Sequence, residues 1–202
     1  MKDEKQLVLF FNEGIKIDNT LLAAKLKEKF EILKDPIVIP FNKNNPNQPL
    51  ILFNRGKLQL SVSIFDVSII YNSELHKELY DTLIEIVELF ENLDYSFVRM
   101  GYISTFLHSK KEREIFKGNV FKDKTMVESE FQLSWYKKEL IDSVSVNVWK
   151  KALTDIINKV EFVTIYDINT PMDEKYNITS EFLSDFIKKC DKYIIENEKE
   201  LK

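Results

Sequence analysis

Apolar and polar residues follow two successive periods in residues 50–92. Between Leu58 and Ile64 every second residue is apolar, which places these side chains on one face of a strand. Asn54-Arg55-Gly56 can form a three-residue hairpin loop before this strand, because glycine tolerates the positive φ that such a loop needs. After a third alternating run that ends at Tyr71, apolar residues recur every three or four positions. The segment therefore predicts a hairpin, a third strand and an amphipathic helix packed across them.

The predicted helix begins after Ser73, whose hydroxyl can cap it. Its core-facing residues are apolar: Leu75, Leu79, Leu83, Ile86, Val87 and Phe90. A second set is acidic and lies along one edge: Glu74, Glu78, Asp81, Glu85, Glu88 and Glu91. This acidic ribbon is either a solvated outer face or a surface that attracts a basic partner.

The N-terminal part of the chain predicts a further strand and helix. Residues 6–11, QLVLFF, have the composition of a strand. Asp18 is a candidate N-cap for a helix that Pro36 ends. An extended piece at 37–39 then leads into a loop rich in Asn and Pro at 41–49.

The C-terminal part predicts more strands and a last helix. Residues 97–106 have the pattern of a strand, in which Gly101 indicates a bulge or a close backbone contact. Thr179 or Ser180 is the expected N-cap of the last helix, and Cys190 lies on its apolar stripe as a packing residue. Between them we expect strands at 131–135, 144–148 and 160–168, with one or two helical turns at 149–158.

This order of elements predicts two similar halves, residues 1–93 and 94–202, packed as one globular unit. Each half is β-α-β(3-4)-α, and two such units can join edge to edge into one sheet. We therefore expect an α+β fold, an antiparallel sheet with helices packed on one face. The order resembles the duplicated arrangement of the TATA-binding-protein-like fold, and a resemblance of fold carries no function by itself.

Composition narrows the class of protein. The chain has 202 residues, of which 44% are hydrophobic and 31% charged, as in ordinary globular proteins. Its net charge of −4 argues against a surface that seeks nucleic acid or anionic membrane over its whole extent. No apolar run reaches the roughly 18 residues that a membrane span needs, and the N-terminus lacks signal-peptide features. A cytoplasmic location is therefore expected.

Few residues suggest catalysis or a metal site. His76 and His108 have no second histidine or cysteine nearby, so ordinary imidazoles are expected rather than zinc ligands. The single Cys190 excludes an internal disulfide, and the four glycines form no phosphate-binding loop. We therefore predict no catalytic residue, cofactor or metal. Asp167, with the carboxylates of 173–174 after it, could in principle hold a hard cation, but the spacing fits no calcium loop, so a strand-end Asp and a turn are expected instead.

Residues 107–124 form a locally basic stretch that predicts a short helix ending at Gly118. Its basic residues are Lys110, Lys111, Arg113, Lys117, Lys122 and Lys124. They are candidates for binding nucleic acid or an acidic partner. Trp135, Tyr136 and Trp149 are candidate stacking platforms for single strands, although aromatic residues in alternating strands usually belong to a core or an interface.

Three short motifs carry a family resemblance. They are Gln59-Leu60-Ser61, Arg99-Met100-Gly101 and Asp167-Ile168-Asn169, each in or at the end of a predicted strand. Over residues 50–195 the chain resembles a sporadically distributed bacterial family of similar size with no assigned activity. A second Arg and a Tyr-Ile-Asn in the middle strand of that family are missing or altered here. The resemblance implies no catalytic residues.

Three functions are compatible with these observations. The first is a non-enzymatic binding protein that occupies a partner protein's surface. Such a protein could be an inhibitor or immunity factor from a mobile element or defence locus, for example an anti-CRISPR-like inhibitor. The second is nucleic-acid binding through the basic segment 108–124, and the third is a carboxylate-metal-dependent hydrolase. No membrane partner is expected, and the oligomeric state stays open.

Overall fold

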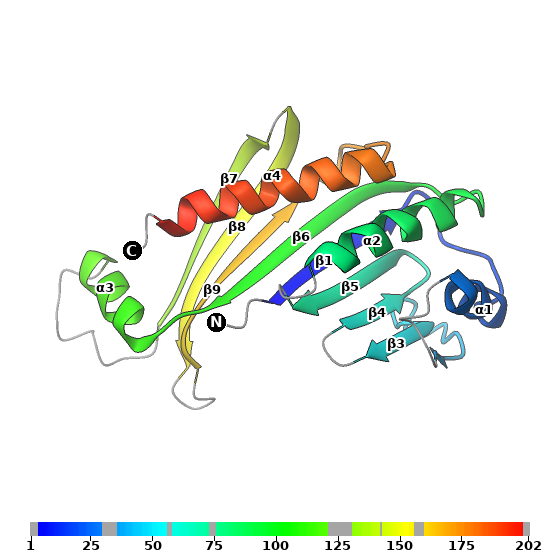
Figure 1. The fold of residues 1–202 in the computed structure, drawn as a ribbon, viewed down its shortest axis with the longest axis horizontal. Helices are drawn as coiled ribbons and strands as arrows, with labels where there is room; N and C mark the ends of the chain where they lie inside the picture. The colour runs from blue at the N-terminus through cyan, green and yellow to red at the C-terminus, as the bar shows by residue number, and fades with distance from the viewer. Residues whose placement is uncertain are drawn as a thin grey trace.

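The computed structural model contains one antiparallel sheet with helices on one of its faces (Figure 1). It describes residues 4–29, 36–55, 58–72, 76–120, 131–141, 143–155 and 160–199. Within these residues the sheet has nine strands and the chain has four helices. The predicted α+β class, an antiparallel sheet with helices packed on it, is confirmed.

The elements alternate between single strands, helices and antiparallel meanders. The first half contains β1 (Glu4–Phe11), α1 (Asn19–Lys29), β2 (Ile37–Val38), β3 (Ile51–Arg55), β4 (Leu58–Val62), β5 (Asp66–Asn72) and α2 (His76–Glu91). The second half contains β6 (Phe97–Leu107), α3 (Lys110–Val120), β7 (Gln132–Ile141), β8 (Val144–Asp155), β9 (Val160–Asn169) and α4 (Ser180–Lys199). The strand order in the sheet is β2-β3-β4-β5-β1-β6-β9-β8-β7.

The two halves share this element order apart from the short strand β2. In each half the first strand pairs with the last strand of the meander that follows, as β1 does with β5 and β6 with β9. β1 and β6 also pair with each other, which joins the halves into one sheet. The first helices differ in their contacts, because α1 contacts β2 whereas α3 contacts β9. That the halves are copies of one unit stays a prediction.

The alternation in residues 58–71 produces the strands that it predicts. Leu58, Leu60 and Val62 are buried in β4, and the residues between them are more exposed. The turn into β5 is closed by Ser63, whose hydroxyl accepts a hydrogen bond from the amide of Asp66 and donates one to its carboxylate. A side chain thus satisfies backbone and side-chain groups where the two strands reverse direction.

The hairpin between β3 and β4 differs from the prediction. Asn54 pairs with Gln59 and Arg55 pairs with Leu58, so the three-residue loop Asn54-Arg55-Gly56 is wrong. The ladder continues for these two extra pairs, because each adds backbone hydrogen bonds that a longer loop would leave to water. Gly56 lies outside the described residues.

Two helix caps are confirmed by the structure. The Asp18 carboxylate accepts hydrogen bonds from the amides of Thr20 and Leu21, both at 3.0 Å, and α1 begins there. The Thr179 hydroxyl accepts one from the amide of Phe182 at 3.2 Å, at the start of α4. Each cap satisfies amides that have no partner within the first turn. The role of Pro36 in ending α1 cannot be followed, because residues 30–35 lie outside the described part.

The apolar stripe of α2 packs as predicted over its described length. Leu83, Ile86, Val87 and Phe90 are buried, whereas Ser73 and the side chains of 76–81 lie outside the described residues. The helix is followed by a turn in which Asp94 has a φ of 62°, a conformation that short polar residues tolerate best after glycine.

The second half requires three corrections. Residues 149–155 belong to β8 and are not helical, because they pair with β7 on one side and β9 on the other. Gly101 is neither a bulge nor a close contact: it pairs regularly with Val8 and Asn169, and the register shift lies between Phe10 and Phe11. The helix predicted to end at Gly118 continues to Val120.

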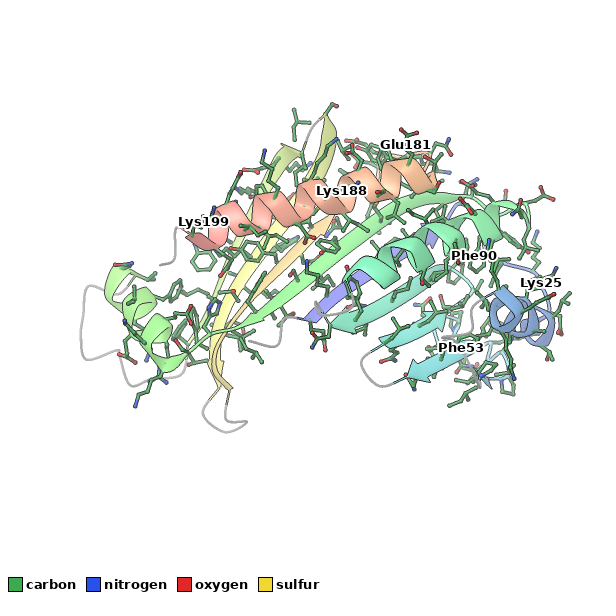
Figure 2. The ribbon with its side chains drawn as sticks, viewed as in Figure 1. Lys25, Phe53, Phe90, Glu181, Lys188 and Lys199 are labelled. Carbon is green, nitrogen blue, oxygen red and sulfur yellow. The ribbon has the colours of Figure 1, made fainter. Side chains whose placement is uncertain are left out.

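The core lies between the sheet and the helices. Its main cluster joins buried residues of β1 and of β3 to β9 to those of α1, α2 and α4, and a smaller cluster lies under α3. Figure 2 labels Phe53 and Phe90, which are 1% and 0% exposed, and Glu181 and Lys188 on the exposed side of α4. The described helices therefore cover one face of the sheet, and no helix of the described residues covers the other face.

Candidate functional site

The sheet has an open face, defined as the face turned away from the helices. In β1, Leu7 and Leu9 are buried in the main core, while Gln6, Val8 and Phe10 between them are only half-buried. Successive side chains of a strand point to opposite faces. The residues that share a face with Gln6, Val8 and Phe10 through cross-strand pairing therefore form the open face.

A row of paired residues crosses the open face from β3 to β7. Direct cross-strand partners lie on the same face of a sheet. The register links Asn54, Gln59, Ile70, Gln6, Ile103, Asp167, Trp149 and Tyr136 in that order. Both rings at the aromatic end of the row are exposed, Tyr136 at 47% and Trp149 at 41%.

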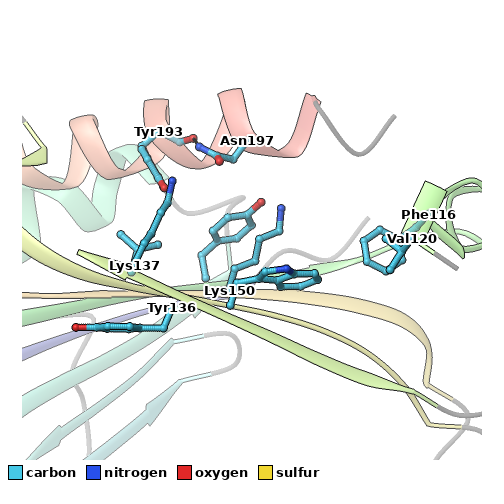
Figure 3. Close-up of a pocket in the computed structure, with 10 residues that line it drawn as sticks. Phe116, Val120, Tyr136, Lys137, Lys150, Tyr193 and Asn197 are labelled. Carbon is cyan, nitrogen blue, oxygen red and sulfur yellow. Dashed lines mark hydrogen bonds between the residues drawn. The ribbon is translucent and has the colours of Figure 1, made fainter. Parts of the chain in front are cut away.

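Tyr136 and Trp149 form an aromatic platform on neighbouring strands. Their ring centroids lie 4.5 Å apart, with an angle of 42° between the rings. The Tyr136 hydroxyl donates a hydrogen bond to the side-chain oxygen of Asn147 at 2.9 Å. Figure 3 shows Tyr136 on the far side of the strands from Tyr193 and Lys137, which lie toward α4. Because both rings extend from paired strands, the backbone ladder fixes their relative position.

Two exposed lysines flank the aromatic platform. Lys138 follows Tyr136 by two residues in β7, and Lys151 follows Trp149 by two residues in β8. Each therefore lies on the open face, about 6.8 Å along its strand from the ring. Because the strands are antiparallel, Lys138 pairs with Asn147 and Lys151 with Ser134. The ammonium groups thus occupy opposite corners of a patch with the aromatic rings at its centre.

A hydrogen-bond ladder of polar side chains lies beside this patch. The amide of Asn147 donates to the side-chain oxygen of Asn169 at 3.3 Å, and the amide of Asn169 donates to Asp167 at 3.1 Å. Asp167 is the cross-strand partner of Trp149. Its carboxylate is thus the acidic group closest in register to the platform, and its hydrogen bond with Asn169 orients it.

A second cation and ring meet in the middle of the open face. The guanidinium carbon of Arg99 lies 5.0 Å from the centroid of the Phe10 ring, and the two residues are cross-strand partners. This distance is in the range of a cation–π contact. Within the described residues, the Nε atom of Arg99 is buried without a hydrogen-bond partner. The open face thus combines aromatic rings, cations and amides.

The basic segment 108–124 divides between exposed and buried positions. Lys110 and Lys111 are exposed at the start of α3, and Arg113 pairs with Glu114 at 2.9 Å. Lys117 is 2% exposed, with its Nζ atom 5.7 Å from the Phe131 ring centroid, so it does not belong to an exposed basic surface. The remaining members, Lys122 and Lys124, lie outside the described residues.

The acidic ribbon can be followed over its second half. Glu85 is half-buried, and Glu88 and Glu91 are exposed on α2. A carboxylate oxygen of Glu88 lies 4.0 Å from the Nζ of Lys29 on α1. The first half of the ribbon lies outside the described side chains: Glu74, Glu78 and Asp81.

His108 lies in a polar cluster that the sequence did not indicate. Its Nε2 lies 2.7 Å from the hydroxyl of Thr164, which also donates to Glu198 at 3.0 Å. Its Nδ1 lies 3.9 Å from Glu112, four residues later on α3. The His108 side chain is 4% exposed, and the cluster joins the end of α4 to the sheet. His76 has a side chain outside the described residues.

No described group of side chains forms a metal site. Among these residues, no three or more His, Cys, Asp or Glu side chains converge to hold an ion. Asp167 is hydrogen-bonded to Asn169, and Glu174 pairs with the hydroxyl of Tyr176. Burial raises the pKa of the Cys190 thiol, which is 0% exposed. This thiol is therefore a packing group and not a nucleophile.

Sequence reasoning named the two rings of the platform but missed the lysines beside them. Lys138 and Lys151 lie outside the basic segment, and each follows an aromatic residue by two positions. In a strand this spacing places both side chains on one face. For Lys151 this two-residue spacing carried no information about a shared face, because residues 149–158 were expected to be helical and not extended.

The chain matches no family model, and no curated protein matches its sequence. In the described part of the chain, no helix is both long enough and apolar enough to span a membrane.

Proposed function

We propose that this protein is a non-enzymatic binding protein that holds single-stranded nucleic acid on the open face of its sheet. The observation that carries the proposal is the aromatic platform, Tyr136 and Trp149, with Lys138 and Lys151 at opposite corners. Base stacking needs exposed rings, and phosphates need cations within reach of them. The patch supplies both on strands that pairing holds in place.

The proposal also accounts for the overall acidic charge. A net charge of −4 disfavours nucleic acid at most of the surface. The platform is a local exception, because among the described side chains two lysines there oppose one carboxylate, that of Asp167. Partly exposed amides and hydroxyls of the open face, such as Gln6 and Ser68, can donate to bases and accept from them. A cytoplasmic location would fit this function and stays a prediction.

We expect Trp149→Ala to weaken binding of single-stranded DNA by about tenfold or more, since base–ring stacking contributes about 1–3 kcal/mol per base. The measurement is the fluorescence anisotropy of a labelled oligothymidine at low salt. Lys138→Gln and Lys151→Gln should each weaken binding less at high salt than at low salt. If each lysine meets one phosphate, each change should reduce the slope of log affinity against log salt by about 0.7.

Trp135→Ala is the matched control for this experiment. Trp135 is 43% exposed and precedes Tyr136 in β7, so it points to the face that carries the helices. It should leave the affinity for oligothymidine unchanged. If Trp135→Ala weakens binding as much as Trp149→Ala does, or if no oligonucleotide binds at low salt, the proposal is wrong.

A second candidate function is protein binding through the acidic ribbon, as in an inhibitor or immunity factor. The exposed carboxylates of Glu88 and Glu91 on α2 favour it, because an acidic helix edge attracts a basic partner. Reversing both residues together with Glu85 to lysine should abolish co-purification of that partner. If every partner and every phenotype survives the triple reversal, the ribbon is a solvated face.

We further infer that the halves derive from one repeated unit of the TATA-binding-protein-like type. The shared order of elements and the pairing of β1 with β6 support this inference. It concerns ancestry and architecture, and the binding function does not depend on it.

A further inference from the structure

The Asp167 carboxylate has hydrogen-bonding capacity left beside the aromatic platform. Asp167 is half-buried in β9 and is the cross-strand partner of Trp149 in β8. Among the described residues, one hydrogen bond reaches this carboxylate, from the amide of Asn169 to Oδ1 at 3.1 Å. An ionised carboxylate has about four acceptor positions. Oδ2 and a further lone pair of Oδ1 are therefore left for the donors of a ligand.

A directed chain of hydrogen bonds ends at this carboxylate. The Tyr136 hydroxyl donates to Asn147 at 2.9 Å, and the amide of Asn147 donates to Asn169 at 3.3 Å. The amide of Asn169 in turn donates to Asp167. Every bond runs in the same direction, and successive bonds of this kind polarise one another. The chain thus holds the carboxylate in place as a group that only accepts.

Trp149 lies between Tyr136 and Asp167 in one row across three strands. Tyr136 packs against the indole from the β7 side, at a centroid distance of 4.5 Å. A base that stacks on the rest of the indole therefore lies toward β9. Neighbouring strands are about 4.8 Å apart, so one edge of that base comes within reach of the Asp167 carboxylate.

Guanine is the base whose edge best matches a carboxylate. Its Watson–Crick edge presents two adjacent donors, N1–H and an N–H of the 2-amino group, and the two oxygens of a carboxylate can accept both. Adenine and cytosine place an acceptor beside their amino group, and thymine has one N–H between two carbonyl oxygens. A group that only accepts opposes those acceptors. In a single strand this edge has no pairing partner, so a protein can read it.

We propose that Asp167 makes guanine the preferred base at the aromatic platform, an inference that rests on the function proposed above for the open face. The guanine ring stacks on Trp149 while its N1–H and 2-amino group donate to the Asp167 carboxylate. Lys138 and Lys151 meet the phosphates on either side of that nucleotide. The charge of Asp167 repels the phosphates of every strand, and guanine compensates with two hydrogen bonds. Asp167 is thus a residue that determines specificity.

Oligothymidines with one central substitution test the proposal in the unaltered protein. Fluorescence anisotropy at low salt compares the all-thymidine strand with strands that carry one deoxyguanosine, one deoxyinosine or one deoxyadenosine. The deoxyguanosine strand should bind about tenfold more tightly than oligothymidine, the size expected for a bidentate contact to a base. Inosine keeps N1–H but lacks the 2-amino group, so its strand should bind more weakly than the deoxyguanosine strand. Adenine lacks the adjacent donor pair, so its strand should also bind more weakly.

Asp167→Asn separates recognition of guanine from a general effect of charge. Asparagine keeps the shape of the side chain and an oxygen for Asn169, but it replaces the second acceptor by an N–H donor. It should abolish the preference for guanine and leave oligothymidine binding as tight as before or tighter, because it removes a negative charge.

Glu4→Gln is the matched control for the change of charge. Glu4 is exposed in β1, two residues before Gln6, and therefore lies on the open face. It pairs with Asn72 and Thr105, away from the aromatic platform. Glu4→Gln removes the same charge from the same face and should leave the preference for guanine intact.

The results distinguish this inference from the proposed function. If oligothymidine binds but deoxyguanosine gives no advantage, or if the advantage survives Asp167→Asn, the recognition of guanine is wrong and the binding function stands. The inference is also overturned if the deoxyadenosine or deoxyinosine strand binds as tightly as the deoxyguanosine strand, because stacking alone then explains the preference. If no oligonucleotide binds at low salt, the proposed function and this inference are both wrong.

Discussion

Asp191→Ala should destabilise the protein by about 3 kcal/mol, because it breaks a buried ion pair on one side only. The Asp191 carboxylate on α4 accepts hydrogen bonds from the Nζ of Lys5 and the hydroxyl of Tyr102, both at 2.6 Å. Lys5 is 7% and Tyr102 is 0% exposed. The ammonium of Lys5 also lies 5.7 Å from the centroid of the Tyr102 ring. Removing the carboxylate withdraws the opposite charge from a cation that water cannot readily reach.

Urea denaturation followed by circular dichroism measures the loss, with Asp185→Ala as the matched control. Asp185 lies on the same helix and pairs with Lys189 at the surface, so its loss should cost less than about 0.5 kcal/mol. The double variant Lys5→Met with Asp191→Leu should recover part of the stability, because no buried charge then remains at either position. If Asp191→Ala is no more costly than Asp185→Ala, the interaction does not hold α4 on the sheet.

Phe90→Ala should cost about 4 kcal/mol, because it removes a fully buried ring from an aromatic cluster. Phe90 is 0% exposed on α2, and its ring centroid lies 5.1 Å from that of Phe11 and 5.6 Å from that of Phe97. Phe11 and Phe97 stack on each other at 4.7 Å. The cluster joins α2 to β1 and β6, the two strands at which the halves of the chain meet.

The same denaturation experiment separates the stability cost of losing apolar volume at position 90 from the cost of losing the aromatic ring. Phe90→Leu keeps much of the apolar volume and should cost about 1.5 kcal/mol. Glu91→Ala, at the next and exposed position, should change stability by less than about 0.5 kcal/mol. A cost below about 1 kcal/mol for Phe90→Ala would mean that α2 is not packed on these strands as described.

Local sequence patterns predicted those strands and helix starts that depend on residues a few positions apart. Period-two alternation predicted β4 and β5, and the polar side chains of Asp18 and Thr179 predicted helix starts. These predictions succeed because a pleat or a cap depends on neighbours in sequence. The apolar stripe of α4 likewise predicted a packing role for Cys190, which is 0% exposed.

The prediction of helical turns at residues 149–158 was wrong for the part that forms β8, because contacts far apart in sequence overrode a local preference. After Trp149 the chain continues Lys-Lys-Ala-Leu, residues with high intrinsic helix propensity. Pairing with β7 and β9 overrides that propensity, because each pair adds backbone hydrogen bonds on both edges of the strand. Local preference is a weak prior where tertiary contacts are available to the segment on both sides.

The candidate site likewise depends partly on local sequence and partly on contacts between distant residues. The aromatic character of Tyr136 and Trp149 was visible in the sequence, but their contact at 4.5 Å depends on the register between two strands. The same register carries Lys138 and Lys151 to opposite corners, so neither a charge run nor a motif marked the patch.

The sequence alone predicted an α+β chain with antiparallel strands and amphipathic helices, and it assigned the buried faces of β4 and β5. Which strands became neighbours was decided only by the tertiary structure, as were the partner of Lys5, 186 residues away at Asp191, and the surroundings of His108. The reason is physical: periodicity states that a face will be buried, whereas the identity of what covers it depends on contacts between residues far apart in the chain.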